Sequence, residues 1–468
     1  MKIKKLNNIL VFLLAIIMVL SVVACGGKSD SDDGNAKEAK EEDKTSEDSG
    51  KKSDSGETVQ ITFWHAMGGS IGKALEEIVA DYNQSQDKVE VVAQYQGTYD
   101  DTLTKLRSSA AGSDVNADLV QVFEMGTQFL IDSGLIVPMQ DMIDKSKFDT
   151  SVLEENLLAY YTLNGKLYSM PFNSSTPLMY YNKTAFDDAG ITDIPTNIEE
   201  IKEIADKITG AKSSDSTTVQ YPMSVDIYGW YMEQWLNKTG KDTFDHGNGR
   251  EDHATKAAFD ENGSMLKVVS MWKDVADSGV MPNNGREGGN AEFVAGTSAI
   301  TLASTANLNQ ILTEVGGRFE VGTAYFPGID AEDKAGVSIG GASLWMIDSG
   351  DDTRKDATWD FVQYLVSADV QAKWNVATGY FPVNTGAHDT DVFKENIEKN
   401  PQFKTAIDQL HDATADDQGA ISGVNQEART YYEAELEKAL NGEKTPEEAV
   451  AAMAEQVNAA LDSYNAAK

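Results

Sequence analysis

The sequence is poor in the residues that enzymes most often use for covalent or metal chemistry. It contains one cysteine, Cys25, and five histidines among 468 residues. A single cysteine excludes a disulfide within the chain, and the histidines have no i,i+4 pair or other metal-ligand spacing. Neither a G-x-S-x-G nor an H-E-x-x-H motif occurs. We therefore expect no catalytic residue, no metal and no cofactor.

Positive charge is scarce as well. The chain has 39 Lys and Arg against 75 Asp and Glu, which gives a formal net charge of −36. A surface this acidic repels nucleic acid and anionic membrane surfaces, so we expect no nucleic-acid partner. Because the sequence contains only six arginines, each of them is a candidate for a specific role.

Long apolar runs are absent after the N-terminus. Three lysines in the first five residues precede an apolar stretch that ends at Ala24, which is typical of a signal peptide over residues 1–24. The run Val22-Val23-Ala24-Cys25-Gly26 resembles the lipobox of bacterial lipoproteins. This resemblance implies that Cys25 is lipidated, becomes the mature N-terminus and anchors the protein to the cell membrane on its extracytoplasmic face.

The segment that follows Cys25 lacks aromatic and branched aliphatic residues. Residues 26–57 consist of Lys, Asp, Glu, Ser, Thr, Gly and Asn with two alanines. Such a segment cannot bury enough apolar surface to offset the entropy lost on ordering. We interpret 25–57 as the lipidated cysteine and a disordered acidic tether, with a folded body that begins near Thr58.

The first third of the body alternates strand and helix signals. Apolar and polar residues alternate over 59–63 and 89–95, and a short apolar run covers 117–123, which predicts three strands. Apolar residues at helical spacing lie between the strands. A β-α-β-α-β order predicts a mostly parallel sheet with helices on its faces, hence an α/β fold.

Two local signals are strong. Asn164-Gly165 lies between two short apolar runs, as in a two-residue β-hairpin. Thr445, Pro446 and Glu448 have the spacing of a capping box with proline in the first turn, and an apolar stripe follows them. A second α/β region is expected after Pro171, and the length of the body suits two lobes.

Several runs of polar and aromatic residues remain after these assignments. They are Phe63-Trp64-His65-Ala66-Met67-Gly68-Gly69, PFNSSTPLMYYNKTAFDDAG at 171–190, IGGASLW at 339–345 and TGYFPV at 378–383. Together they resemble the family 1 extracellular solute-binding proteins of ABC importers, most closely those that bind glycerol 3-phosphate. The resemblance extends from about residue 59 to the C-terminal helix.

This resemblance implies a periplasmic-binding-protein-like fold with two discontinuous lobes and a ligand cleft between them. We expect 58–175 and 325–372 to form the first lobe, and 176–324 and 373–468 the second. The chain would bind a small solute and deliver it to the permease subunits of an ABC importer, without catalysing a reaction.

The resemblance also assigns a set of ligand-binding positions. They are Tyr99, Glu124, Ser175, Trp230, Ser304, Gly341, Tyr380 and Arg429. The guanidinium of Arg429 is expected to grip a phosphate through two charge-assisted hydrogen bonds, while tyrosine and serine hydroxyls supply neutral donors. Glu124 is expected to accept from glycerol hydroxyls, and Trp230 to pack against the carbon face of the ligand.

One wall of the predicted site departs from the family pattern. The family has two nearby Gly-Trp pairs, whereas this chain has one, Gly229-Trp230, with an apparent deletion after it. A remodelled wall would admit a larger head group, so the expected ligand is glycerol 3-phosphate or a glycerophosphodiester. Trp64 and His65 either line the cleft or serve a structural role.

Three alternatives stay open at this point. An oligosaccharide-binding protein of the same superfamily would stack its aromatic residues on sugar rings. An exported hydrolase would need a catalytic set, which the sequence does not contain, and a surface adhesion module would not need an anion-binding group at Arg429.

Overall fold

A computed structural model describes residues 58–111, 115–286, 288–414 and 417–468. These residues lie in one compact unit, Gly56–Lys468. The predicted signal peptide, the lipidated Cys25 and the acidic tether lie outside the described residues. Within the described ranges, no helix is both long enough and apolar enough to cross a membrane.

The first sheet is built largely from the N-terminal third of the chain. Its order is β2-β1-β3-β12-β4, with β7 paired to β12 off this path. Its strands are β1 (Val59–His65), β2 (Val89–Tyr95), β3 (Leu119–Phe123), β4 (Ile136–Val137), β7 (Met170–Ser175) and β12 (Gly340–Ile347). The strands β1, β2 and β3 pair in parallel, as the β-α-β-α-β signal predicts, whereas β12 runs antiparallel to each of its partners.

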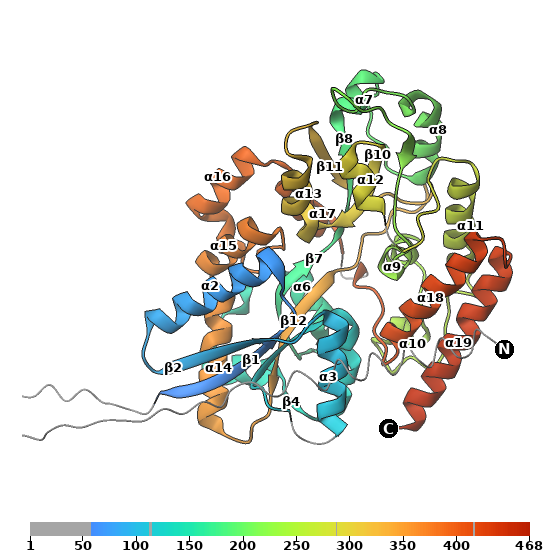
Figure 1. Cartoon of the computed structure of the whole chain (residues 1–468). Coiled ribbons are helices and arrows are strands. Elements are labelled where there is room, and N and C mark those ends of the chain that lie inside the picture. Colours follow the sequence, from blue (N-terminus) through green and yellow to red (C-terminus); the bar gives the residue numbers. More distant parts are fainter. Residues whose placement is uncertain (1–57, 112–114, 287, 415–416) are drawn as a thin grey trace, which may run out of the picture. The chain divides into compact units, whose positions relative to one another are not determined.

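The second sheet comes from the middle of the chain. Its order is β11-β8-β10-β9. Its strands are β8 (Pro177–Asn182), β9 (Tyr221–Met223), β10 (Ser298–Ser304) and β11 (Val321–Tyr325). The chain therefore passes from one sheet to the other between β7 and β8 and again between β11 and β12 (Figure 1).

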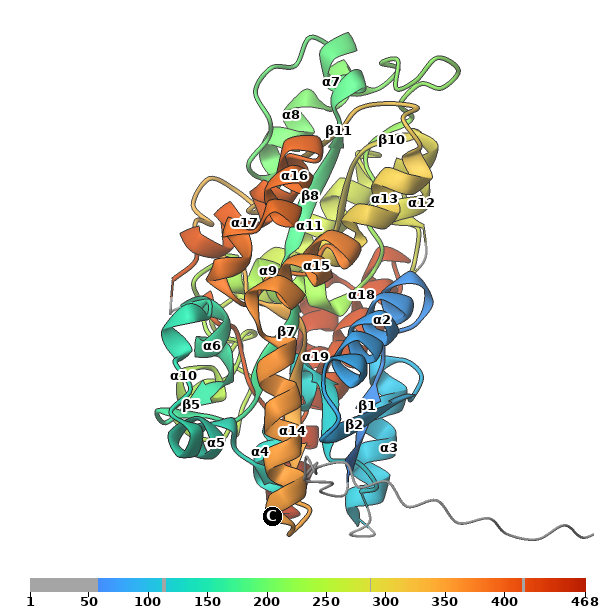
Figure 2. The same ribbon diagram turned by 90° about the vertical axis from the view of Figure 1, so that its left-hand side faces the viewer.

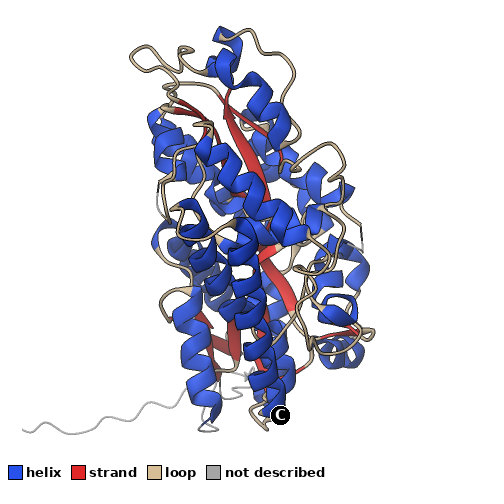
Figure 3. Ribbon diagram, turned by 90° about the vertical axis from the view of Figure 1, so that its right-hand side faces the viewer, coloured by secondary structure: helices blue, strands red, loops and turns tan. Residues whose placement is uncertain are grey.

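Helices surround the strands of both sheets (Figure 3). Those that follow the strands of the first sheet up to β7 are α2 (Gly69–Ser85), α3 (Tyr99–Ala111), α4 (Thr127–Ser133), α5 (Met139–Ser146) and α6 (Glu155–Tyr161). Those between β8 and β11 are α7 (Lys183–Asp188), α8 (Ile198–Ile208), α9 (Gly229–Lys238), α10 (Asp245–Gly249), α11 (Ser264–Asp277), α12 (Gly289–Ala295) and α13 (Leu308–Val315). After β12 come α14 (Asp352–Leu365), α15 (Ala368–Thr378), α16 (Asp391–Lys399), α17 (Gln402–Asp412), α18 (Asn425–Leu440) and α19 (Pro446–Ala466).

Short 3₁₀ turns connect some of these elements. They are η1 (Glu124–Gly126), η2 (Thr150–Val152), η3 (Thr305–Asn307) and η4 (Thr385–Asp389). Two of them, η1 and η3, directly follow a strand that ends at the cavity described below.

The buried apolar residues form two large clusters. The first includes the strands of the first sheet and also takes residues from α14, α15 and α17. The second includes strands of the second sheet and the apolar faces of α11, α18 and α19. Figures 1 and 2 show α18 and α19 side by side at the end of the chain. The α/β fold with two sheets is confirmed, whereas the residue boundaries of the lobes stay a prediction.

Two local predictions are confirmed in detail. Asn164 and Gly165 both have positive φ and join β5 (Thr162–Leu163) to β6 (Lys166–Leu167), as a type I′ hairpin requires. Thr445 and Glu448 form a reciprocal capping box at the start of α19, with Pro446 in its first turn.

Candidate functional site

A cavity of about 270 Å³ lies where elements of the two sheets meet. All eight positions that the sequence predicted line it, namely Tyr99, Glu124, Ser175, Trp230, Ser304, Gly341, Tyr380 and Arg429. They come from α3, η1, β7, α9, β10, β12, the loop after α15, and α18. Residues up to 330 positions apart in the sequence therefore share one cavity, although their binding roles remain predictions.

Two tyrosines form one wall of the cavity. The hydroxyls of Tyr99 and Tyr380 lie 3.2 Å apart. Tyr99 stacks on Phe123 with ring centroids 5.3 Å apart, and Tyr380 stacks on Trp374 at 5.9 Å. Burial raises the pKa of both phenols, so both stay protonated hydrogen-bonding groups at neutral pH.

A buried amide relay fixes the position of this tyrosine pair, and the sequence argument did not find it. The Asn173 side-chain amide donates to the Tyr99 hydroxyl at 2.6 Å, and Gln121 donates to the Asn173 amide oxygen at 2.7 Å. The Gln121 oxygen in turn accepts from the backbone of Ala66 at 2.9 Å. Asn173 is part of the quoted PFNSSTP run, but only the pairing of β7 with β12 and of β12 with β3 brings these amides together.

We call Ser175, Ser304, Gly341 and the start of η3 and α13 the serine side of the cavity. Ser175 ends β7, and Ser304 ends β10, where its hydroxyl accepts from the backbone N–H of Ala306 at 3.2 Å. Ala306, Asn307 and Gln310 also line the cavity. A helix start carries partial positive charge and exposes backbone N–H groups, so this side is rich in neutral donors.

Gly341 is required at its position in β12. Its φ is +89°, and a Cβ added there would lie 2.1 Å from the backbone oxygen of Asn173. A side chain would therefore push β12 away from β7. The glycine lets the main chain itself form part of the cavity wall.

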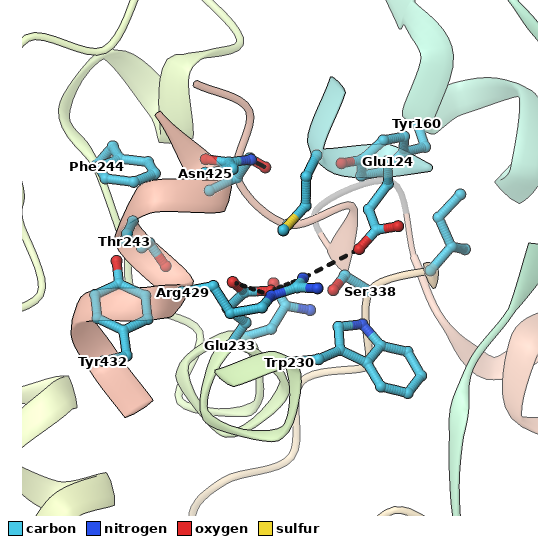
Figure 4. Close-up of a pocket in the computed structure, with 16 residues that line it drawn as sticks. Glu124, Tyr160, Trp230, Glu233, Thr243, Phe244, Ser338, Asn425, Arg429 and Tyr432 are labelled. Carbon is cyan, nitrogen blue, oxygen red and sulfur yellow. Dashed lines mark hydrogen bonds and ion pairs between the residues drawn. The ribbon is translucent and has the colours of Figure 1, made fainter. Parts of the chain in front are cut away.

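We call Glu124, Glu233, Arg429 and Tyr228 the arginine side. The Nε of Arg429 donates to one oxygen of Glu233 at 3.1 Å, and Nη2 donates to the other at 2.6 Å. Nη2 also donates to Glu124 at 3.0 Å (Figure 4). The fork that the sequence argument assigned to a phosphate is thus already engaged by carboxylates.

Glu233 was not predicted from the sequence. It lies in the first half of α9, three residues after Trp230, close to the point where the chain departs from the family pattern. Nothing in the local sequence connects it with a residue 196 positions later. The approach of α9 to α18 creates the ion pair, and Gly229 permits it, because a Cβ there would lie 2.2 Å from the Cγ of Arg429.

The three charged groups of the arginine side are largely removed from water. The exposed fractions of the side chains are 7% for Arg429, 9% for Glu124 and 25% for Glu233. Burial raises the pKa of Glu124, and Arg429 opposes this shift. Because burial penalises the charged form, and the charge of Glu233 adds to this effect, Glu124 takes up a proton more readily than a free glutamate.

A small second cavity of about 40 Å³ also borders the arginine side. Arg429, Glu124, Glu233 and Trp230 border it, and Figure 4 shows these side chains converging on it. Trp230 borders both this cavity and the larger one, and its indole N–H is buried without a hydrogen-bond partner in the described structure.

A third cavity, of about 260 Å³, adjoins the first on the arginine side. The two share Tyr99, Phe123, Tyr228 and Arg429. The third cavity adds two acidic residues, Asp100 and Glu433, and we call it the annex. Tyr228 faces both spaces and leaves 41% of its surface exposed.

Trp64 and His65 line neither the main cavity nor the annex. The indole of Trp64 donates to Gln94 at 3.2 Å, and Lys105 lies 4.3 Å from its ring centroid. His65 is buried and accepts from the backbone N–H of Met67. Both residues therefore stabilise the end of β1.

The described residues also lack a metal-binding cluster. Within these ranges, no three His, Cys, Asp or Glu side chains are grouped so that they could hold a metal ion.

Comparison with known proteins identifies close relatives. The model of the bacterial extracellular solute-binding protein family matches residues 77–405. The sn-glycerol-3-phosphate-binding periplasmic protein UgpB of Yersinia pseudotuberculosis is 31% identical over 402 residues, which cover 84% of this chain and 90% of that protein. UgpB of Shigella dysenteriae is 29% identical and covers 86% of this chain.

Solved structures agree with the fold. UgpB from Mycobacterium tuberculosis in complex with glycerophosphocholine superposes with a TM-score of 0.71 at 22% identity, over 87% of this chain and 99% of that one. The cyclic α-maltosyl-1,6-maltose binding protein from Arthrobacter globiformis superposes with a TM-score of 0.69 at 24% identity, over 86% of this chain and 99% of that one. At these identities the likeness establishes the two-lobe fold and leaves the ligand undecided.

Proposed function

Because this chain belongs to the bacterial extracellular solute-binding protein family, we propose that its ligand is a glycerophosphodiester or glycerol 3-phosphate. The family is non-catalytic, and its members are solute-binding proteins that serve ABC importers. An ABC permease is its expected partner. The curated relatives at about 30% identity, which are named as binding proteins of sn-glycerol 3-phosphate, support the phosphate-containing ligand.

The observation that carries the proposal is the set of neutral donors on the serine side. Ser175, Ser304 and the main chain around Gly341 border one cavity with the start of η3 and α13. Hydroxyls and backbone N–H groups at a helix start bind phosphate oxygens without a cation. Hydrogen bonds to an ionised acceptor contribute about 1.5–3 kcal/mol each. We therefore assign the phosphate to the serine side.

The charge of the phosphate favours a diester over a monoester. A phosphodiester carries one negative charge, whereas a monoester at pH 7 carries about 1.5–2. Glu124 and Arg429 are the charged residues among the described residues that line the main cavity, and they are paired with each other. Since no unmatched cation faces the phosphate, the singly charged form costs less to bury.

The arginine side then receives the glycerol. Glu124 can accept from one hydroxyl, and Nη1 of Arg429 makes no hydrogen bond to another described residue. The annex gives room for the second substituent of a diester.

A sugar is the second candidate, because aromatic rings are abundant at the cavity. Tyr228, Trp230 and Tyr231 follow one another along its wall with centroids 5.5–6.2 Å apart. Such rings stack on sugar faces. The main cavity of about 270 Å³ lies below the usual range of roughly 300–1,000 Å³ for drug-sized ligands, so an oligosaccharide would have to extend into the annex.

Isothermal titration calorimetry with glycerophosphocholine, glycerol 3-phosphate and maltotriose tests the proposal. We expect both phosphates to bind and the sugar not to bind. Thermal unfolding in each ligand gives an independent readout, because a ligand at 100 times its Kd stabilises the folded state by about 2.7 kcal/mol. Binding of maltotriose with no binding of either phosphate would replace the proposal with the sugar alternative.

We further propose that lipidation of Cys25 anchors the protein to the cell membrane. The evidence is the position of the chain's one cysteine directly after the apolar run. Cys25→Ala is expected to release the protein into the medium or to leave an uncleaved precursor, which membrane fractionation and mass spectrometry of the N-terminus distinguish. A variant that is processed and retained like the wild type would contradict the anchor.

A further inference from the structure

The carboxylate of Glu233 accepts two hydrogen bonds from one edge of the Arg429 guanidinium. It accepts from Nε at 3.1 Å and from Nη2 at 2.6 Å, and the shared donor Nη2 also reaches Glu124 at 3.0 Å. Figure 4 shows Glu233 and Glu124 approaching Arg429 from different elements. A bidentate carboxylate satisfies the same donors that a phosphate would need. An anion could use Nε and Nη2 together only by displacing Glu233, which leaves Nη1 as the one nitrogen of this guanidinium without a partner among the described residues.

The arginine side carries more negative than positive charge. Two carboxylates share one guanidinium, and all three are mostly buried, so their charges are weakly screened. The annex adds Asp100 and Glu433. Glu433 is paired with Arg286 at 2.7 Å, and Asp100 accepts from the amide of Gln426 at 2.6 Å.

The aromatic surface of the annex also favours a cation over an anion. Tyr228 presents its exposed ring to this space, and the guanidinium of Arg429 lies 5.6 Å from the ring centroid. The face of an aromatic ring attracts cations and does not stabilise an anion. Phe123 and Tyr99 extend the aromatic surface between the two cavities.

From these contacts we propose that Glu233 is a positioning and specificity residue that makes the arginine side a charge filter. It holds the Arg429 fork away from anions, so that the substituent reaching this side and the annex must be neutral or cationic. The inference rests on the proposed function, because it concerns the second substituent of a glycerophosphodiester. It selects ammonium-bearing and polyol head groups and rejects those that carry a carboxylate or a second phosphate.

A matched ligand pair tests the filter. Glycerophosphoethanolamine and glycerophosphoserine differ by one carboxylate on the head group. Titration calorimetry of the wild type should give an affinity ratio of about tenfold or more in favour of the ethanolamine form. Glu233→Gln keeps the size of the side chain and one acceptor but removes the charge, and it should bring the ratio close to one.

Two variants control for a merely structural effect. Glu233→Asp keeps the charge and should preserve a ratio above one, even if both affinities fall. Glu427→Gln removes the charge of the half-exposed partner of Arg107 on α18, the helix that also carries Arg429, and should leave the ratio unchanged. Melting temperatures of the ligand-free variants show which of them fold. If Glu233→Gln does not fold, Glu124→Gln takes its place, because it removes the other carboxylate from the same guanidinium and must lower the ratio in the same way.

The outcomes separate the two proposals. Equal wild-type affinity for the two diesters, or an unchanged ratio in Glu233→Gln, would overturn the charge filter and leave the proposed function standing. If the wild type bound neither these diesters nor glycerol 3-phosphate, the proposed function and the filter would both be wrong.

Discussion

The two sides of the cavity differ in what they offer to a charged ligand of the kind that we propose. The serine side offers hydroxyls, main-chain groups and a helix start, none of which carries a formal charge. The arginine side contains formal charges, but its one cation is already paired with two carboxylates before any ligand arrives. The side with the arginine is therefore the less suitable of the two for an anion.

This difference shows that an arginine in a cavity is not evidence of an anion site until its donors are counted. Removing two carboxylates and a guanidinium from water is costly, and the ion pairs recover that cost only while they stay intact. A phosphate that displaced Glu233 would leave a buried carboxylate without its partner. Neutral donors have no competing partner of this kind and can turn to the ligand.

The largest expected effect comes from breaking the arginine side. Arg429→Ala leaves Glu124 and Glu233 buried without their cation, and we expect it to lower the free energy of unfolding of the ligand-free protein by about 3–5 kcal/mol. Urea denaturation measures this change. Arg107→Ala is the matched control, because Arg107 also bridges to α18 through Glu427 but is 27% exposed. It should cost less than about 1 kcal/mol. Equal effects of the two substitutions would contradict a special role for the buried cluster.

A smaller effect is expected on the serine side, and it should appear in affinity alone. The Ser175 hydroxyl makes no hydrogen bond to another described residue, so Ser175→Ala should leave the ligand-free stability unchanged. It should weaken the binding of glycerophosphocholine by about 1.5–3 kcal/mol, measured by calorimetry.

The neighbouring serine is its control. The Ser174 hydroxyl is buried without a partner in the described structure and does not line the cavity. Ser174→Ala should therefore change neither affinity nor stability by more than a few tenths of a kcal/mol. If the two variants weakened binding equally, the phosphate would not lie at Ser175.

The smallest effect is a pH dependence that belongs to the arginine side. Burial raises the pKa of Glu124 above its ordinary value of 4.5. A raised folded-state pKa contributes stability that is complete below the unfolded pKa and is lost as the pH rises through the folded pKa. On acidification from pH 7 to 5, the wild type should therefore gain stability relative to Glu124→Gln, by at most about 1.4 kcal/mol per pH unit. Urea denaturation of both proteins at several pH values measures the difference, and a difference that shrinks on acidification would contradict the assignment.

Much of the fold was predictable because its signals are local. The alternation in the first third, the Asn164-Gly165 hairpin and the Thr445 capping box depend on residues close together in the sequence. The composition of the cavity was predictable for another reason, because the resemblance to a known family carried over eight positions that one cavity then brought together.

The sequence did not predict which groups inside the cavity are already engaged. The pairing of Glu233 with Arg429 depends on the approach of two helices that are far apart in the sequence. The relay from Gln121 through Asn173 to Tyr99 depends on strand register across β3, β12 and β7. Such contacts belong to tertiary structure, and they are the reason why we propose a different role for Arg429 at the same place in the cavity.

A crystal structure of the complex with glycerophosphocholine tests the central claim most directly, because it shows which side holds the phosphate. The account predicts phosphate oxygens within about 2.7–3.2 Å of the donors at Ser175, Ser304 and Gly341. It also predicts that Glu233 still holds Nε and Nη2 of Arg429, with the choline group in the annex. A phosphate bound by the Arg429 fork, with Glu233 displaced from it, would contradict the account.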